Sequence, residues 1–63
     1  SNKIKLNISS FTKATCKDNY CQDYIFECEN KRIRSITPIT GAAIQFDKSW
    51  KDPRTQDQID KVC

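Results

Sequence analysis

Apolar and polar residues alternate near the start of the chain, where three apolar positions are each separated by one polar residue: Ile4, Leu6 and Ile8. A period of two with a single apolar face is typical of a half-buried strand. We therefore predict a strand over residues 3–9. The polar stretch 12–19, which contains Cys16, is predicted to be a loop.

A hairpin is predicted in the middle of the chain. Residues 23–28 are rich in aromatic and β-branched types, which favour a strand. Strand periodicity assigns Tyr24, Phe26 and Cys28 to one face and Ile25 to the other. Residues 29–31 are predicted to turn, because Asn30 tolerates a left-handed backbone. Residues 32–37 then return as the partner strand, with cations facing two acidic residues of the first, Glu27 and Glu29.

The rest of the chain predicts a short strand and a short helix. Pro38 and Gly41 mark a loop, and residues 42–47 form a third extended segment. A helix is expected to begin at Asp52–Pro53, where Asp can cap it and Pro suits its first position. Ile59 and Val62 give this helix a narrow apolar stripe. The predicted fold is a small, disulfide-rich, mainly β domain of about three antiparallel strands with a short C-terminal helix.

Length and cysteine content add a constraint on stability. At 63 residues the chain accommodates one domain, residues 1–63, and such a small domain buries only about 60% of its unfolded surface. Small domains usually need covalent cross-links, and four cysteines can form two. We therefore expect disulfides and a secreted, extracellular protein. The sequence Asn7-Ile8-Ser9 is an N-glycosylation acceptor, in agreement with secretion.

Composition and charge exclude several classes of function. The chain has no histidine and one glycine, so it lacks an imidazole base and a glycine-rich phosphate loop. We expect no enzyme, no cofactor and no metal site. The net charge of +3 is divided into alternating basic and acidic blocks, unlike the single cationic face of a nucleic-acid binder. No apolar run reaches the length of a membrane span, so no membrane-spanning segment is expected.

The four cysteines, Cys16, Cys21, Cys28 and Cys63, allow three pairings. A bond between Cys21 and Cys28 conflicts with the strand predicted between them. The pairing of Cys16 with Cys28 and of Cys21 with Cys63 encloses long loops, which contribute about 3 and about 4 kcal/mol in the chain-entropy model.

A family resemblance follows from the order of several residues. The stretch Cys21-Gln-Asp-Tyr-Ile-Phe-Glu-Cys28, then Gly41, Phe46-Asp47, Trp50-Lys-Asp-Pro53 and the closing Cys63 resembles the peritrophin-A type chitin-binding domain over residues 16–63, with one disulfide pair missing. The resemblance implies the same pairing, Cys16 with Cys28 and Cys21 with Cys63.

The resemblance also implies a ligand and a site. Such modules bind chitin and related N-acetylglucosamine glycans, so the chain is expected to be a non-catalytic carbohydrate-binding module. The implied site lies on residues 45–50: Trp50 and Phe46 would stack on sugar rings, and Asp47 and Gln45 would form hydrogen bonds.

The alternative is a secreted protein-binding ligand, toxin or inhibitor. A basic N-terminal segment, three strands and a C-terminal helix are also the elements of chemokine-like and other cytokine or effector folds, although the cysteine spacing differs from that of chemokines. Exposed blocks of charge favour a protein receptor or target, because complementary fields steer association.

Overall fold

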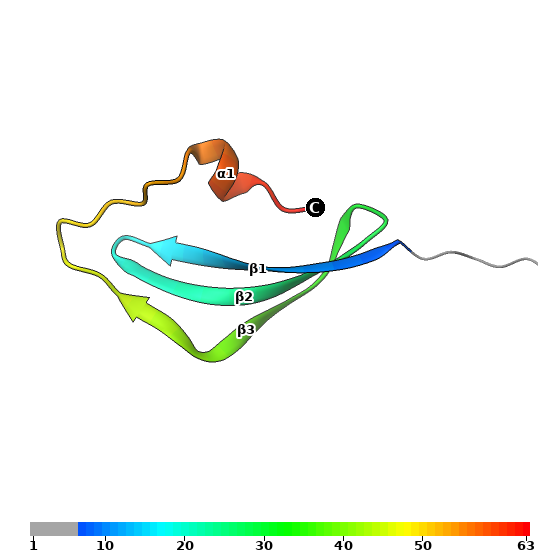
Figure 1. The fold of residues 1–63 in the computed structure, drawn as a ribbon, viewed down its shortest axis with the longest axis horizontal. Helices are drawn as coiled ribbons and strands as arrows, with labels where there is room; N and C mark the ends of the chain where they lie inside the picture. The colour runs from blue at the N-terminus through cyan, green and yellow to red at the C-terminus, as the bar shows by residue number, and fades with distance from the viewer. Residues whose placement is uncertain (1–6) are drawn as a thin grey trace, which may run out of the picture.

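Over residues 7–63 the protein is a three-stranded antiparallel sheet with one short helix, which confirms the predicted fold class. The computed structural model describes residues 7–63, so the predicted strand positions Ile4 and Leu6 lie outside the described residues. The strands are β1 (Ile8–Lys17), β2 (Tyr20–Glu29) and β3 (Arg32–Gln45), in the order β1-β2-β3, and the helix is α1 (Gln56–Asp60). Figure 1 shows the sheet as a meander, with α1 beside β1 and away from β3.

β1 and β2 form a regular hairpin without a register shift from Ile8↔Glu29 to Lys17↔Tyr20. The prediction of a loop over residues 12–19 was wrong, because residues 12–17 belong to β1. This segment is polar but contains β-branched threonines, and an edge strand that is mostly open to solvent needs few apolar side chains. The connecting turn is Asp18–Asn19, where Asp18 has a φ of 54°.

β2 and β3 are joined by the turn predicted at residues 29–31. Asn30 and Lys31 both have positive φ, at 51° and 66°, which is the requirement of a type I′ hairpin turn. The predicted strands 23–28 and 32–37 are both confirmed within longer strands. Arg32 lies opposite Glu29 as expected, whereas Glu27 lies opposite Ser35 and accepts a hydrogen bond from its hydroxyl at 2.7 Å.

β3 is one long irregular strand instead of the predicted strand, loop and separate segment 42–47. Its pairing with β2 shifts between Gln22 and Tyr24, so that residues 39–42 of β3 bulge out of the ladder. Gly41 has a φ of 79°, a conformation that glycine adopts without steric cost. The side-chain amide of Gln22 donates to the carbonyl oxygens of Ile39 and Ala42, at 2.9 and 3.3 Å. The half-exposed Gln22 side chain therefore takes the place of ladder hydrogen bonds at this bulge.

The helix is shorter than predicted and begins later. Thr55 is its N-cap: the Thr55 hydroxyl accepts from the backbone N–H of Gln58, and the Gln58 side chain accepts from the backbone N–H of Thr55. The helix therefore begins after this capping box and not at Asp52–Pro53. The Asp52 carboxylate is bound to Arg54 and does not cap the helix. Ile59 lies in the helix, whereas Val62 lies beyond its end.

The disulfides join Cys16 to Cys21 and Cys28 to Cys63. All four cysteines are bonded, as expected, but the predicted pairing of Cys16 with Cys28 and of Cys21 with Cys63 is wrong. The reason is the extension of β1: it places Cys16 directly opposite Cys21 at the end of the hairpin, with their Cα atoms 4.1 Å apart. Cys28 then pairs with Cys63, the last residue of the chain.

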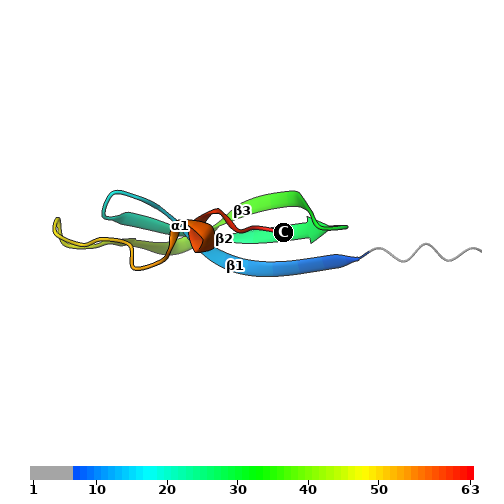
Figure 2. The ribbon, with the colours of Figure 1, turned by 90° about the horizontal axis from the view of Figure 1, so that it is seen from above.

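The sheet is a single layer with two exposed faces. The Phe26 face carries Phe11 of β1, Tyr24, Phe26 and Cys28 of β2, and Ile33 and Ile36 of β3; the Ile25 face carries Thr12, Ala14, Asp23, Ile25, Glu27 and Thr37. Among the described residues, only Cys21, Phe26 and Cys28 are less than a tenth exposed. Figures 1 and 2 place α1 next to the outer edge of β1, and the residues that follow it reach the Phe26 face, where Cys63 is bonded to Cys28.

Candidate ligand-binding site

The four residues implied as a sugar site follow one another at the end of β3. Phe46 and Trp50 come together: their rings are stacked, with centroids 4.2 Å apart and planes at 7°. Gln45 is exposed and pairs with Tyr20 across the sheet. Asp47 is also exposed, and its carbonyl oxygen accepts from the backbone N–H of Trp50 at 2.9 Å. The structure therefore brings the two aromatic rings into contact, whereas the side chains of Gln45 and Asp47 stay exposed.

Asn19, in the turn between β1 and β2, holds Phe46 in place. Its carbonyl oxygen accepts from the backbone N–H of Phe46, and its side-chain amide donates to the carbonyl oxygen of Phe46, both at 2.7 Å. This two-point clamp joins residues 27 positions apart. The aromatic pair is thus fixed to the disulfide-bonded end of the β1–β2 hairpin.

The Asp47 carboxylate is hydrogen-bonded within its own turn. Its carboxylate accepts hydrogen bonds from the hydroxyl and from the backbone N–H of Ser49. These bonds, the hydroxyl above all, hold the pKa of Asp47 below its ordinary value. The group stays a carboxylate down to acidic pH and can accept a hydrogen bond from a ligand only with its remaining lone pairs.

Trp50 borders two hollows of different character. The first, at one end of the Ile25 face, has a mainly apolar lining of Ala14, the Cys16–Cys21 disulfide, Ile44, Phe46 and Pro53, with Asp23, Asp52 and Arg54 also at its border. The second is a polar hollow of about 420 Å³, bordered by Asp18, Asn19, Lys48, Trp50, Lys51 and Asp52. We call this second space the Trp50 hollow. Its volume is within the range of small-molecule sites, roughly 300–1,000 Å³.

Sequence reasoning missed most residues of the Trp50 hollow. Lys48 and Lys51 lie close to Trp50 in the sequence, and this proximity is the one signal that could have identified them. Asp18 and Asn19 lie more than 25 residues earlier and arrive only because the turn between β1 and β2 meets the segment after β3. No local pattern in the sequence signals that meeting.

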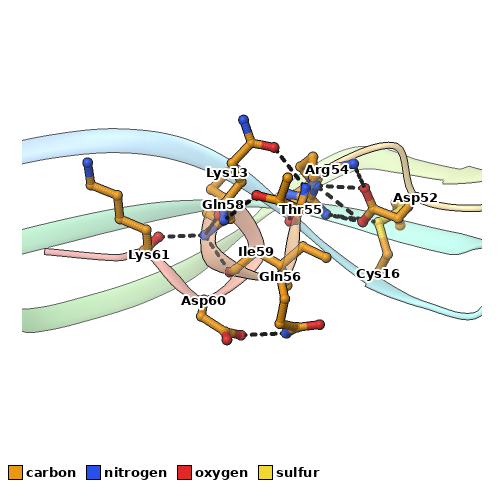
Figure 3. A network of polar contacts seen from close by, with 12 residues as sticks. Lys13, Cys16, Asp52, Arg54, Thr55, Gln56, Gln58, Ile59, Asp60 and Lys61 are labelled. Atoms are coloured by element: carbon orange, nitrogen blue, oxygen red, sulfur yellow. Dashed lines mark hydrogen bonds and ion pairs between the residues drawn. A yellow bond between two sulfur atoms is a disulfide. The ribbon is translucent and has the colours of Figure 1, made fainter.

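An ion pair anchors the segment that follows Trp50 to β1. The Arg54 guanidinium bonds both oxygens of the Asp52 carboxylate, donates to the Ala14 carbonyl oxygen at 2.9 Å and lies 3.5 Å from the Cys16 sulfur (Figure 3). The hydrogen bond from Arg54 lowers the pKa of Asp52, and the same bond raises that of Arg54. Both groups stay charged at neutral pH, so the Asp52 carboxylate at the border of the Trp50 hollow is already paired with a cation.

The remaining predicted residues have no part in this site. Asn7 is exposed at the start of β1, where its carbonyl oxygen accepts from the backbone N–H of Asn30 at 2.9 Å. Within residues 7–63 there is no group of three metal-ligating side chains and no helix able to span a membrane.

Comparisons with protein-family models, with curated protein sequences and with solved structures found no match to this chain. The site is therefore interpreted from its own geometry.

Proposed function

We propose that the protein is a secreted, non-catalytic module that binds chitin or a related N-acetylglucosamine glycan at the Trp50 hollow. The observation that carries this proposal is the double environment of Trp50, which stacks on Phe46 and at the same time borders a hollow of polar side chains. A sugar ring has apolar C–H faces and a polar rim, so a site that binds it needs an aromatic surface beside hydrogen-bonding groups.

The chemistry of the hollow fits such a ligand group by group. Asp18 supplies carboxylate oxygens that accept hydrogen bonds from sugar hydroxyls, Asp52 adds the lone pairs that Arg54 leaves free, and Lys48 and Lys51 supply ammonium donors. The indole of Trp50 offers apolar surface next to them. With both signs of charge around one ring, the hollow suits a neutral polar ligand better than a strongly charged one.

Support for the glycan comes from this geometry and not from the cysteines. The observed disulfides differ from the pairing that the chitin-binding family implies. The aromatic pair is nevertheless held by the Asn19 clamp and the Cys16–Cys21 disulfide, so the site is pre-organised for binding without a disulfide of its own. Two disulfides are compatible with an oxidising, extracellular compartment, and the exposed Asn7 belongs to the proposal as its glycosylation site.

The test is retention of the disulfide-intact protein on chitin beads, together with calorimetric titration of a chitin trisaccharide. We expect binding that Lys51→Ala and Asp18→Gly each weaken several-fold and that Trp50→Ala abolishes. Lys51 and Asp18 are exposed, so their replacement leaves the packing intact, and glycine tolerates the positive φ of 54° at position 18. Complete flow-through of folded protein would contradict the proposal.

The matched control is Tyr20→Ala. Tyr20 is a 48% exposed aromatic residue at the same end of the sheet, but it does not border the hollow. We expect this variant to bind chitin as the unaltered protein does. Equal losses in Tyr20→Ala and Trp50→Ala would show that aromatic exposure in general, and not this site, causes retention.

A further inference from the structure

A cleft of about 300 Å³ opens on the Ile25 face beside the aromatic pair. Its walls are mainly apolar and come from Ala14, the Cys16–Cys21 disulfide, Ile44, Phe46, Trp50 and Pro53. Ile44 is 53% exposed, so this apolar surface is open to solvent. The volume is at the lower end of the range of small-molecule sites, roughly 300–1,000 Å³. We call this space, which Asp23 also borders, the Asp23 cleft.

Asp23 brings an unpaired carboxylate to the apolar walls. It is half-buried on the Ile25 face of the middle strand, and its partner in β1 is Ala14, whose side chain is a single methyl group. On its other side, the register shift between Gln22 and Tyr24 leaves Asp23 without a partner in β3. Its carboxylate takes part in no ion pair within residues 7–63, where the single ion pair is that of Asp52 with Arg54.

The other two charges at the border of the cleft neutralise each other. The Arg54 guanidinium bonds both oxygens of the Asp52 carboxylate (Figure 3). Two carboxylates against one guanidinium leave the lining with one net negative charge, which belongs to Asp23. A carboxylate beside apolar surface is less well screened than one in open water, so it attracts a cation within the cleft more strongly.

This combination of groups favours one kind of ligand. Apolar walls bind a hydrocarbon body, and aromatic residues also attract organic cations. A carboxylate accepts charge-assisted hydrogen bonds from an ammonium group. A metal ion is a poorer match, because the described residues contain no group of three metal-ligating side chains and the apolar walls offer it nothing.

We infer that the Asp23 cleft binds a small primary amine with an apolar body. The ammonium group donates to the Asp23 carboxylate, and the body lies against Ile44 and Phe46. Trp50 and Asp52 border both this cleft and the Trp50 hollow, but the two spaces differ in charge: mixed charges in the hollow suit a neutral ligand, whereas the net negative charge of the cleft suits a cation. The inference does not depend on glycan binding.

The experiment titrates the disulfide-intact protein at pH 7 with phenethylamine and with two probes of the same body, the neutral 2-phenylethanol and the anionic 3-phenylpropanoate. Trp50 is the only tryptophan and borders the cleft, so its fluorescence reports binding. We expect the amine to bind about tenfold more tightly than the alcohol, and the anion not to bind. Asp23→Asn should reduce the affinity for the amine to that for the alcohol. Ile44→Ser should weaken both probes alike, because it removes apolar wall and no charge.

Glu27→Gln is the matched control. Glu27 is a carboxylate on the same face of the same strand, but it accepts a hydrogen bond from Ser35 and does not border the cleft. This variant should bind the amine within twofold of the unaltered protein. Equal affinity of the unaltered protein for amine and alcohol, or a preference for the amine that survives Asp23→Asn, would overturn the inference.

Two variants separate this inference from glycan binding. Asp23→Asn should keep chitin retention, since Asp23 does not border the Trp50 hollow, and Lys51→Ala should keep amine binding, since Lys51 does not border the Asp23 cleft. If Asp23→Asn abolished chitin retention together with amine binding, the two spaces would be one site, and a separate amine site would be refuted.

Discussion

The Cys28–Cys63 disulfide is predicted to contribute far more to stability than the Cys16–Cys21 disulfide. Its cysteines are 35 residues apart, against 5 for the other bond. In the chain-entropy model, loops of these lengths correspond to about 4 and about 2 kcal/mol of stabilisation. The free energy of unfolding of a 63-residue domain is roughly 3–9 kcal/mol at typical values per residue. Loss of the longer loop therefore removes a large part of the total.

The perturbation is the paired replacement of each disulfide by alanines, Cys28→Ala with Cys63→Ala and Cys16→Ala with Cys21→Ala. Urea unfolding followed by circular dichroism should show the first variant about 4 kcal/mol less stable than the unaltered protein, and the second about 2 kcal/mol less stable. Equal losses, or a larger loss for the second variant, would refute the reasoning from loop length.

The pairing itself is checked by mass spectrometry of a non-reduced digest. Trypsin cleaves after Lys17 and Lys31, and chymotrypsin cleaves after Tyr24, between Cys21 and Cys28. The structure predicts the Cys16 fragment that ends at Lys17 bonded to the Cys21 fragment that ends at Tyr24, and the Cys28 fragment bonded to the C-terminal one. Any other pair of cross-linked fragments contradicts the observed fold of β1.

Three further predictions concern single contacts. The pKa of Asp52 is lowered, so its pairing with Arg54 stabilises the fold fully above the ordinary aspartate pKa of about 3.9. The stabilisation is lost as the pH falls through the lowered pKa. In urea titrations from pH 6 to pH 2, the difference in unfolding free energy between the protein and Asp52→Asn should therefore shrink. Lys13 donates to three carbonyl oxygens at the end of α1, so Lys13→Met should cost about 1–2 kcal/mol and speed amide exchange in residues 58–62, whereas Lys31→Met should change neither. Gly41→Ala meets no atom within 4 Å but retains a φ of 79°, so a loss of about 1 kcal/mol is expected in urea unfolding; no loss would mean that the bulge relaxes.

The candidate site depends on both local and long-range contacts, and only the local ones could be predicted from the sequence. Phe46, Asp47 and Trp50 are close in sequence, and their grouping was expected because a short segment keeps its residues together. Whether the rings would stand apart or stack on each other depended on Asn19, whose two hydrogen bonds fix Phe46 from another part of the chain. The Trp50 hollow needed the same long-range meeting, so it could not be read from residues 45–50.

The class of fold, the β2–β3 hairpin and its turn could be predicted from the amino-acid sequence. These depend on interactions between neighbours: alternation along β2, and the left-handed backbone that Asn30 permits. The cysteine pairing and the length of β1 depend instead on how the strands pair. Cys21 faces Cys16 across the hairpin because β2 pairs with a polar edge strand along its whole length. The start of α1 follows from a local signal that the sequence prediction missed, the capping box of Thr55 and Gln58. Local patterns express the preferences of a segment, whereas pairing depends on which segments meet.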